Sequence, residues 1–92
     1  MYALTFDLVV AEAAKHHPKG VTHAYTEIGT VLGKYGFQRV HGSLYTTESD
    51  DMTSLFLAIQ ALRARAWFQK SVWDIRAFRI EQWTDFTAVV KS

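Results

Sequence analysis

The spacing of the apolar residues constrains the fold of this chain more than any other feature. The first segment alternates with a period of two, which places one set of side chains on each face of a strand. One set is Tyr2, Leu4, Phe6 and Leu8, and the other is Ala3, Thr5, Asp7 and Val9. We therefore predict a half-buried strand at the start of the chain.

Two later segments repeat their apolar residues at helical intervals instead. The first runs from Val21 to Tyr35, and Gly36 behind it suits the left-handed end of a helix. The second is predicted to begin after Ser49 or Asp50, either of which can cap a first turn, and to end near Ala66. Its predicted inward face holds Met52, Leu55, Phe56, Ile59 and Leu62, with Arg63 and Arg65 toward water.

The remaining segments are predicted to be strands and connections. Phe37–Thr47 has strand-forming residues on both sides of His41-Gly42, so it forms either a two-strand hairpin or one strand bent by a glycine bulge. Val72–Ile80 is predicted to be a further strand, in which a change of alternation indicates a bulge or burial on both faces. The segments left as connections are Ala11–Gly20, where a proline disfavours helix, and Trp67–Ser71.

The order of these elements selects a fold class. Strand, helix, one or two strands, helix, strand is the order of a split βαβ unit. It predicts an α+β fold, a ferredoxin-like βαββαβ sandwich whose antiparallel sheet has two helices on one face and leaves the face with Asp7 open to water or a second subunit. The tail Glu81–Ser92 has apolar residues at helix-like intervals after Thr84, so we expect it to dock, as such tails often do on a partner subunit.

Composition narrows the class of protein. Ninety-two residues, 49% of them hydrophobic, suffice for one packed domain and not for two, so residues 1–92 are predicted to form a single domain. The absence of cysteine excludes disulfides, a thiolate nucleophile and cysteine-based metal sites. No membrane-length apolar run or signal-peptide pattern occurs, which favours a cytoplasmic protein. A net charge of +1 selects no class of partner, although cations gather between Arg63 and Arg79.

Asp7 is the most informative candidate site residue. Aspartate is depleted in strands, and this one interrupts an otherwise apolar or small run near the end of the first strand. A solvated carboxylate paired with Arg39 or Arg76 explains it without function. The functional interpretation is a metal ligand or a carboxylate for phosphodiester cleavage, and a two-fold dimer would bring two copies of it together around a shared ion such as Mg²⁺.

Three further candidates surround the His41-Gly42 break. Ser43 follows a glycine at a turn, where backbone amides and its hydroxyl can face an anion, although a turn serine is also ordinary. His41 would be a general base for a ribose 2′-hydroxyl if it lay near Asp7 and Ser43, a role that histidine often takes. Arg39, like Arg76 on the last strand, is a candidate for neutralising phosphates.

The other polar and aromatic signals have simpler structural explanations. His16, His17 and His23 match no zinc motif, and the first two are expected to be solvated in a loop. Tyrosines at helical spacing are expected to pack in the core, with stacking on RNA bases as the alternative. Gly29 and Gly33 share a helix face, which predicts close packing rather than a phosphate loop.

Three stretches of the sequence together resemble a known family. They are MYALTFDL at the start, HGSLYT after the first helix and SVWDIRAFRIEQWTDFT near the end. The chain resembles the virulence-associated protein D (VapD) family along its whole length. The resemblance implies a small ferredoxin-like homodimer, related in fold to the small CRISPR adaptation proteins with a nuclease-type fold, and an endoribonuclease toxin of a bacterial toxin–antitoxin system.

The resemblance also implies roles for individual residues. Asp7 matches the catalytic carboxylate of the first strand, and Ser43 matches a serine placed near it. Asp74 and Arg76 match polar positions of the DIRAFR stretch, whereas Trp73 stands where a basic residue is expected. The preferred hypothesis is a homodimeric endoribonuclease for single-stranded RNA, with a cognate antitoxin protein as a second partner and no membrane. The alternatives are a non-catalytic dimer that binds nucleic acid or an antitoxin, and a metabolite-binding regulatory domain.

Overall fold

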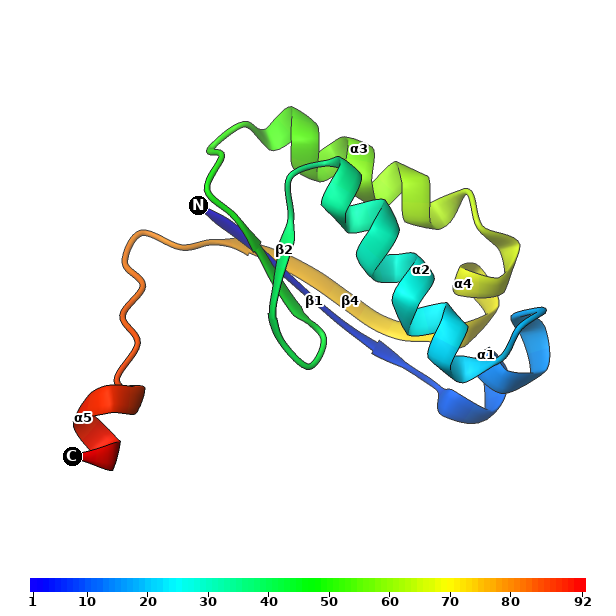
Figure 1. The fold of residues 1–92 in the computed structure, drawn as a ribbon. Coiled ribbons are helices and arrows are strands. Elements are labelled where there is room, and N and C mark those ends of the chain that lie inside the picture. The colour runs from blue at the N-terminus through cyan, green and yellow to red at the C-terminus, as the bar shows by residue number, and fades with distance from the viewer.

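The computed structural model describes residues 1–92 as one four-stranded sheet with five helices (Figure 1). The elements follow in the order β1 (Tyr2–Leu8), α1 (Val10–His16), α2 (Val21–Lys34), β2 (Gln38–His41), β3 (Leu44–Thr47), α3 (Met52–Arg63), α4 (Ala66–Ser71), β4 (Val72–Arg79) and α5 (Thr87–Lys91). The predicted first strand, the helix after Val21 and the last strand are therefore confirmed, each within one residue of its expected end.

The four strands form an antiparallel sheet in the order β2-β3-β1-β4. This order puts β1 at the centre, between the hairpin of β2 and β3 on one side and β4 on the other. The long helices α2 and α3 lie on the same side of the sheet (Figure 1). The arrangement is compatible with the predicted ferredoxin-like sandwich.

The hydrophobic core lies between the sheet and these two helices. Leu4 and Phe6 of β1 are buried against Ile28 and Leu32 of α2 and Leu62 of α3. The alternation predicted for the first strand is thereby confirmed, since the residues between them belong to the opposite face. That opposite face of β1, with Thr5 and Asp7, carries no helix, and we call it the open face.

Two predicted connections are in fact helical. Residues Val10–His16 form α1, because three alanines favour helix and Pro18 restricts only the residue before it. That residue, His17, is extended and ends the helix. The link Trp67–Ser71 likewise forms most of α4, whose last residue accepts a backbone hydrogen bond from Val9 at 2.8 Å. The two short helices therefore pack together where β1 ends and β4 begins.

Helix α3 differs from the prediction at both ends and in its inward face. Its N-cap is Asp51, whose carboxylate accepts from the Thr53 amide at 2.8 Å, rather than Ser49 or Asp50. It ends at Arg63, before the expected Ala66. The buried stripe is Leu55, Ala58 and Leu62, while Met52 and Phe56 are exposed. Arg63 is exposed as expected, but Arg65 is half-buried in an ion pair.

The hairpin combines the two alternatives that the sequence left open. It has two strands, and Gly42 between them has a φ of 53°, a left-handed conformation that favours glycine. The register also shifts between Arg39 and His41. As a result Arg39 pairs with Tyr45, whose side chain is in the core, and His41 pairs with Leu44. A bulge therefore sends Arg39 and His41 of the same short strand to opposite faces of the sheet.

The last strand contains a bulge, but near its start at Trp73 and not between Ala77 and Phe78, where the change of alternation predicted it. Asp7 of β1 pairs with Asp74, and the next residue, Leu8, pairs with Val72. The register shift between them leaves Trp73 unpaired and 67% exposed. From Asp74 onward the alternation is regular, with Ile75 and Ala77 on the helix face and Arg76 and Phe78 on the open face.

The tail does not dock on its own chain as expected. Beyond Ile80 it leads away from the sheet to α5 (Figure 1), and Phe86, Val89 and Val90 are more than 60% exposed. Helix α5 also begins after Phe86, not at the predicted cap Thr84. Apolar side chains at such exposure are typical of a segment that packs on another molecule.

Candidate functional site

Asp7 lies on the open face near the end of the central strand. Its neighbours Phe6 and Leu8 point into the core, so the alternation of β1 directs the Asp7 side chain away from it, where the residue is exposed. The antiparallel register places Asp7 opposite Asp74 of β4. Two carboxylates on directly opposed strand positions repel each other, an arrangement that stability alone does not favour.

One cation offsets this repulsion. The Nε atom of Arg76 donates to Oδ1 of Asp74 at 3.1 Å, and Arg76 itself pairs in register with Thr5, two residues before Asp7. The predicted group of Asp7, Asp74 and Arg76 is thus brought together on the open face of β1 and β4. Asp7 has no ion pair or hydrogen bond of its own in this group, so its carboxylate is free to meet a substrate or a second copy of the chain.

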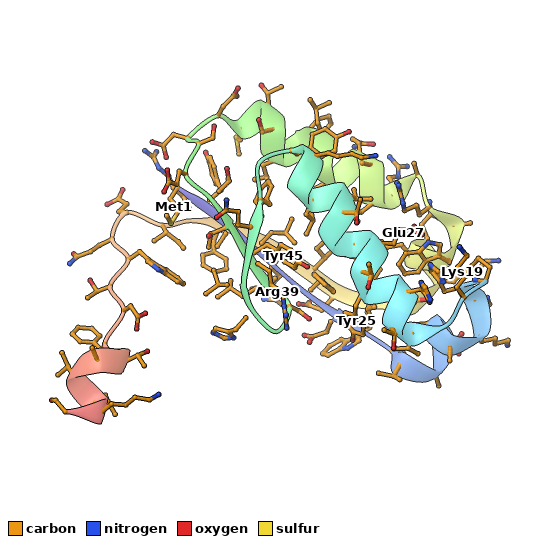
Figure 2. All side chains as sticks on the ribbon, in the orientation of Figure 1. Met1, Lys19, Tyr25, Glu27, Arg39 and Tyr45 are labelled. Carbon is orange, nitrogen blue, oxygen red and sulfur yellow. The ribbon has the colours of Figure 1, made fainter.

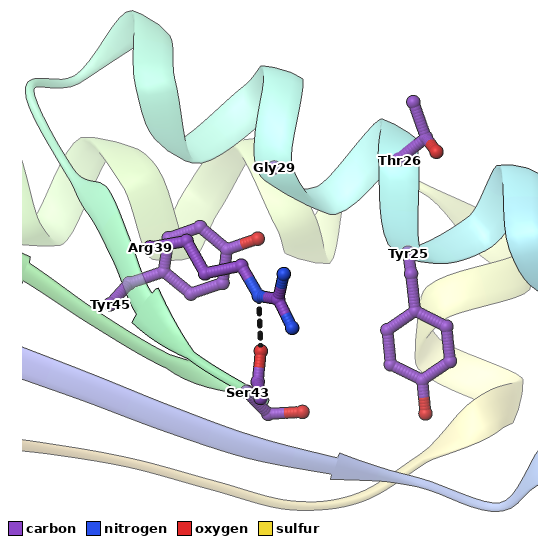
Figure 3. A pocket seen from close by; sticks show the side chains of 7 residues that line it. Tyr25, Thr26, Gly29, Arg39, Ser43 and Tyr45 are labelled. Atoms are coloured by element: carbon purple, nitrogen blue, oxygen red, sulfur yellow. Dashed lines mark hydrogen bonds between the residues drawn. The ribbon is translucent and has the colours of Figure 1, made fainter.

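Arg39 and Ser43 lie on the other side of the sheet, in a cavity of about 560 Å³ between α2 and the hairpin. The Arg39 Nε atom donates to the Gly42 carbonyl oxygen at 2.8 Å, which directs the guanidinium into the cavity beside Ser43 (Figure 3). Ser43 is half-buried. Serine and arginine are therefore neighbours, as expected of phosphate-binding groups, but not on the face that carries Asp7.

Two tyrosines complete the walls of this cavity. Tyr45 is 6% exposed and stacks on Phe6 at 6.1 Å between ring centroids, and Tyr25 is 36% exposed at the outer edge. Tyr45 of the hairpin is therefore a core residue, whereas Tyr25, whose helical spacing predicted core packing, is exposed. Burial raises the pKa of the Tyr45 hydroxyl, against the opposing charge of Arg39, so the group stays a neutral donor.

The two predicted helix glycines serve different purposes. A Cβ atom at Gly29 would lie 3.1 Å from the Tyr45 hydroxyl, so glycine makes room for that group, as close packing requires. A Cβ atom at Gly33 would meet nothing within 4 Å, so close packing was the wrong explanation there.

His41 lies on the same face of the sheet as Asp7, but its strand β2 is not adjacent to β1. Its register partner Leu44 pairs with Thr5 of the open face. The His41 side chain therefore lies on the open face as well. Since β3 lies between β2 and β1, His41 is about 10 Å from β1, two strand spacings of roughly 4.8 Å each. Ser43 precedes Leu44 and so lies one strand away from Asp7.

A polar cluster that the sequence did not reveal holds α1, α2 and α4 together. Glu27 of α2 accepts hydrogen bonds from Trp67 Nε1 and Arg65 Nε, both at 2.8 Å, and contacts His17 Nε2 at 3.2 Å. Because His17 Nδ1 accepts from the Lys19 amide, the ring proton is on Nε2, which donates to Glu27. His17 is 6% exposed, so its expected place in a solvated loop was wrong.

The charge state of Glu27 follows from these donors. Burial tends to raise its pKa, but hydrogen bonds from Trp67, His17 and Arg65 outweigh that effect and hold the pKa below its usual value of 4.5. In Figure 2 Glu27 lies on the part of α2 that faces Lys19 and the end of α1, away from the labelled Arg39 and Tyr45. We assign this cluster a structural role.

Metal ligands do not gather within one chain. No three or more histidine, aspartate or glutamate side chains come close enough to hold an ion together. His16 bonds Glu12 at 3.0 Å within α1, and His17 bonds Glu27. The open face supplies two carboxylates, Asp7 and Asp74, so a cation there would need further ligands from RNA, water or a second chain. None of the helices is both long and apolar enough to cross a membrane.

The fold defines a class of small α+β protein with two carboxylates on an open sheet face, and relatives identify the family. No protein-family model matches the chain. An endoribonuclease VapD homolog of Neisseria gonorrhoeae is 61% identical over 92 residues, and endoribonuclease VapD of Haemophilus influenzae is 55% identical over 92, both across the full length of each chain. Endoribonuclease VapD of Dichelobacter nodosus is 45% identical over 91 residues, 99% of this chain and 98% of the relative. The chain belongs to the VapD family, as its resemblance in sequence implied.

Proposed function

We propose that this protein is an endoribonuclease that cuts single-stranded RNA. The observation that carries the proposal is identity of 61% and 55%, over complete chains, with proteins named endoribonuclease VapD. Identity at this level over complete chains supports a common fold and a common activity. The structure adds an exposed carboxylate near the end of the central strand, with an arginine on the adjacent strand.

Asp7 is the catalytic carboxylate in this proposal. It is exposed, free of any ion pair, and lies on the face without helices, where a phosphodiester can reach it. Asp74 and Arg76 support it from the neighbouring strand, where the guanidinium of Arg76, which donates from Nε to Asp74, can donate its remaining N–H groups to a phosphate oxygen. Ser43, for which the resemblance implies a place near Asp7, lies in the cavity on the helix face of the sheet and takes no part at Asp7 in this proposal.

Two chemical routes are consistent with these residues. In one, Asp7 carboxylates would hold Mg²⁺, which would activate a water molecule as nucleophile and stabilise the developing negative charge. In the other, a side-chain base removes the proton of the ribose 2′-hydroxyl, which then attacks the adjacent phosphorus and expels the 5′-oxygen. The ends of the products distinguish the routes. A 5′-phosphate and sensitivity to EDTA would support the first, and a 2′,3′-cyclic phosphate formed in EDTA would support the second.

A homodimer is part of the proposal. The open face exposes Phe78 next to Arg76, and the tail exposes Phe86 and Val89. Apolar side chains beside charged ones are typical of the surfaces that subunits bury. With the open faces of two copies adjoining, Asp7 of each would lie near the two-fold axis, where the pair could share one ion.

The test compares the wild type with Asp7→Ala for both cleavage and binding of a labelled single-stranded RNA. We expect Asp7→Ala to bind the RNA as the wild type does, to keep its dimer content, and to lose cleavage. Cleavage that persists in Asp7→Ala, or that separates from the protein during purification, would instead favour the alternative of a non-catalytic dimer that binds nucleic acid or an antitoxin.

We further propose that the chain is the cytoplasmic toxin of a toxin–antitoxin system, because an endoribonuclease that cuts cellular RNA would need restraint by a cognate antitoxin protein. Co-expression of neighbouring open reading frames with the wild type should reveal one that restores growth. A wild type that does not slow growth when expressed alone would argue against this role.

A further inference from the structure

The cavity between α2 and the hairpin is separate from the open-face site. It has a volume of about 560 Å³, within the range of roughly 300–1,000 Å³ of pockets that hold small ligands. Its walls are Tyr25 and Gly29 of α2 and Arg39, Ser43 and Tyr45 of the hairpin. These residues come from segments that the fold holds rigidly, since Tyr45 and Phe6 belong to the core.

The charge of the cavity is positive and uncompensated. Arg39 forms no ion pair, and its one hydrogen bond, from Nε to the Gly42 carbonyl, leaves both terminal nitrogens without a protein acceptor. No aspartate or glutamate lines the walls. A guanidinium that is held in place and lacks a partner is suited to a phosphate group, which it can bind through two parallel hydrogen bonds.

The neutral groups favour a nucleotide over a bare anion. The hydroxyl groups of Tyr25, Ser43 and Tyr45 form no hydrogen bonds within the protein and are free to donate. In Figure 3 the Arg39 guanidinium points into the space between Tyr45 and Tyr25, with Ser43 below it. Tyr25 is 36% exposed, so its ring is accessible for stacking against a base.

We propose that this cavity binds one nucleotide of the RNA substrate, with the phosphate on Arg39 and Ser43 and the base against Tyr25. The inference rests on the proposed function and adds a subsite to it. The cavity adjoins the catalytic strand, because Phe6, the residue before Asp7, contacts both tyrosine rings at centroid distances of 6.3 and 6.1 Å. An RNA chain that passes around the hairpin tip would then be held on both faces of the sheet.

Binding of adenosine 3′-monophosphate, followed by NMR shifts of the Tyr25 and Arg39 amides, tests the subsite apart from cleavage. We expect the same affinity in the wild type and in Asp7→Asn, a loss of at least tenfold in Arg39→Gln, and no change in the control Arg63→Gln, whose side chain is exposed on α3. Tyr25→Leu should weaken the nucleotide but leave inorganic phosphate unchanged. Arg39→Gln and Tyr25→Leu both alter exposed side chains, so their melting temperatures should match that of the wild type.

Other outcomes would overturn the subsite without touching the proposed function. No shift at Tyr25 or Arg39 on adding the nucleotide, or equal affinity in Arg39→Gln, would refute it. Equal binding of inorganic phosphate and the nucleotide, with Tyr25→Leu without effect, would reduce the cavity to an anion site and refute the base contact. In RNA cleavage, Arg39→Gln and Tyr25→Leu should raise KM at least tenfold, with kcat within about threefold of the wild-type value. Failure of the proposed function would give a different result, because the wild type itself would then show no cleavage.

Discussion

Removal of the Glu27 carboxylate should lower the free energy of unfolding more than removal of any other exposed or half-exposed carboxylate. In Glu27→Ala the Nε2 proton of His17, whose side chain is 3% exposed, loses its acceptor. An unsatisfied buried donor costs about 1–3 kcal/mol, and the partly exposed Trp67 indole adds a fraction of that. Arg65 keeps its bond to the Ala61 carbonyl and can also be solvated, so it adds little. The expected loss is about 2–3 kcal/mol.

Thermal unfolding by circular dichroism measures this loss. For a domain of this size, about 2.5 kcal/mol corresponds to a fall in Tm of roughly 10–20 °C. The matched control is Glu12→Ala, which breaks a single contact to His16 on the surface of α1 and should cost under about 0.5 kcal/mol. Equal melting temperatures for Glu27→Ala and Glu12→Ala would refute the assignment of Glu27 as the acceptor that joins these helices.

The pH dependence gives an independent check of the same cluster. Because the folded-state pKa of Glu27 is below its unfolded value of 4.5, the ionised carboxylate stabilises the fold fully above pH 4.5. That contribution is lost as the pH falls through the lower, folded-state value. The stability difference between the wild type and Glu27→Gln should therefore shrink as the pH is lowered from 5 toward 3, and a constant difference would contradict the charge assignment.

Three further perturbations test the fold and the assembly. Leu4→Ala removes a fully buried side chain from the central strand and should cost about 3 kcal/mol in urea unfolding, and a loss under about 1 kcal/mol would contradict the placement of the core. Asp51→Ala should cost about 1 kcal/mol, more than Ser49→Ala, if Asp51 is the cap of α3. Phe78→Glu, a change of a 48% exposed side chain on the open face, should leave the monomer folded and reduce the dimer fraction in sedimentation, whereas an unchanged dimer would exclude that face as the interface.

Periodicity made much of the fold accessible from the sequence alone. The alternation around Leu4 and Phe6 identified the central strand and set Asp7 on the face without helices, because the period of two leaves no other choice once one face is buried. The turn at Gly42 was visible because a residue without a Cβ atom marks a left-handed position. The short helices were not predicted, since about seven residues are too few to show a helical period. Pro18 predicts a segment without helix, although it restricts only His17, which ends the helix.

The division of the candidate site between two faces needed the structure. A strand of regular period would place Arg39 and His41 on one face, and a one-residue register shift between them separates the two. Sequence reasoning therefore grouped Ser43 and Arg39 with Asp7, although the first two line a cavity under α2. The burial of His17 could not be predicted from the sequence either. Its acceptor Glu27 and the neighbouring Trp67 lie 10 and 50 positions further along the chain, and only the fold brings them together.

The rate of RNA cleavage by Asp7→Asn under single-turnover conditions tests the central claim most directly. Asparagine keeps the shape of an exposed side chain and removes its charge, so the fold and the melting temperature should not change. Asp85→Asn, which neutralises an exposed carboxylate of the tail, is the matched control and should cleave as the wild type does. We expect cleavage by Asp7→Asn to fall by at least about 100-fold, the typical contribution of a group that transfers a proton. Equal rates for the two variants, in preparations free of contaminating ribonuclease, would show that Asp7 takes no part in the reaction.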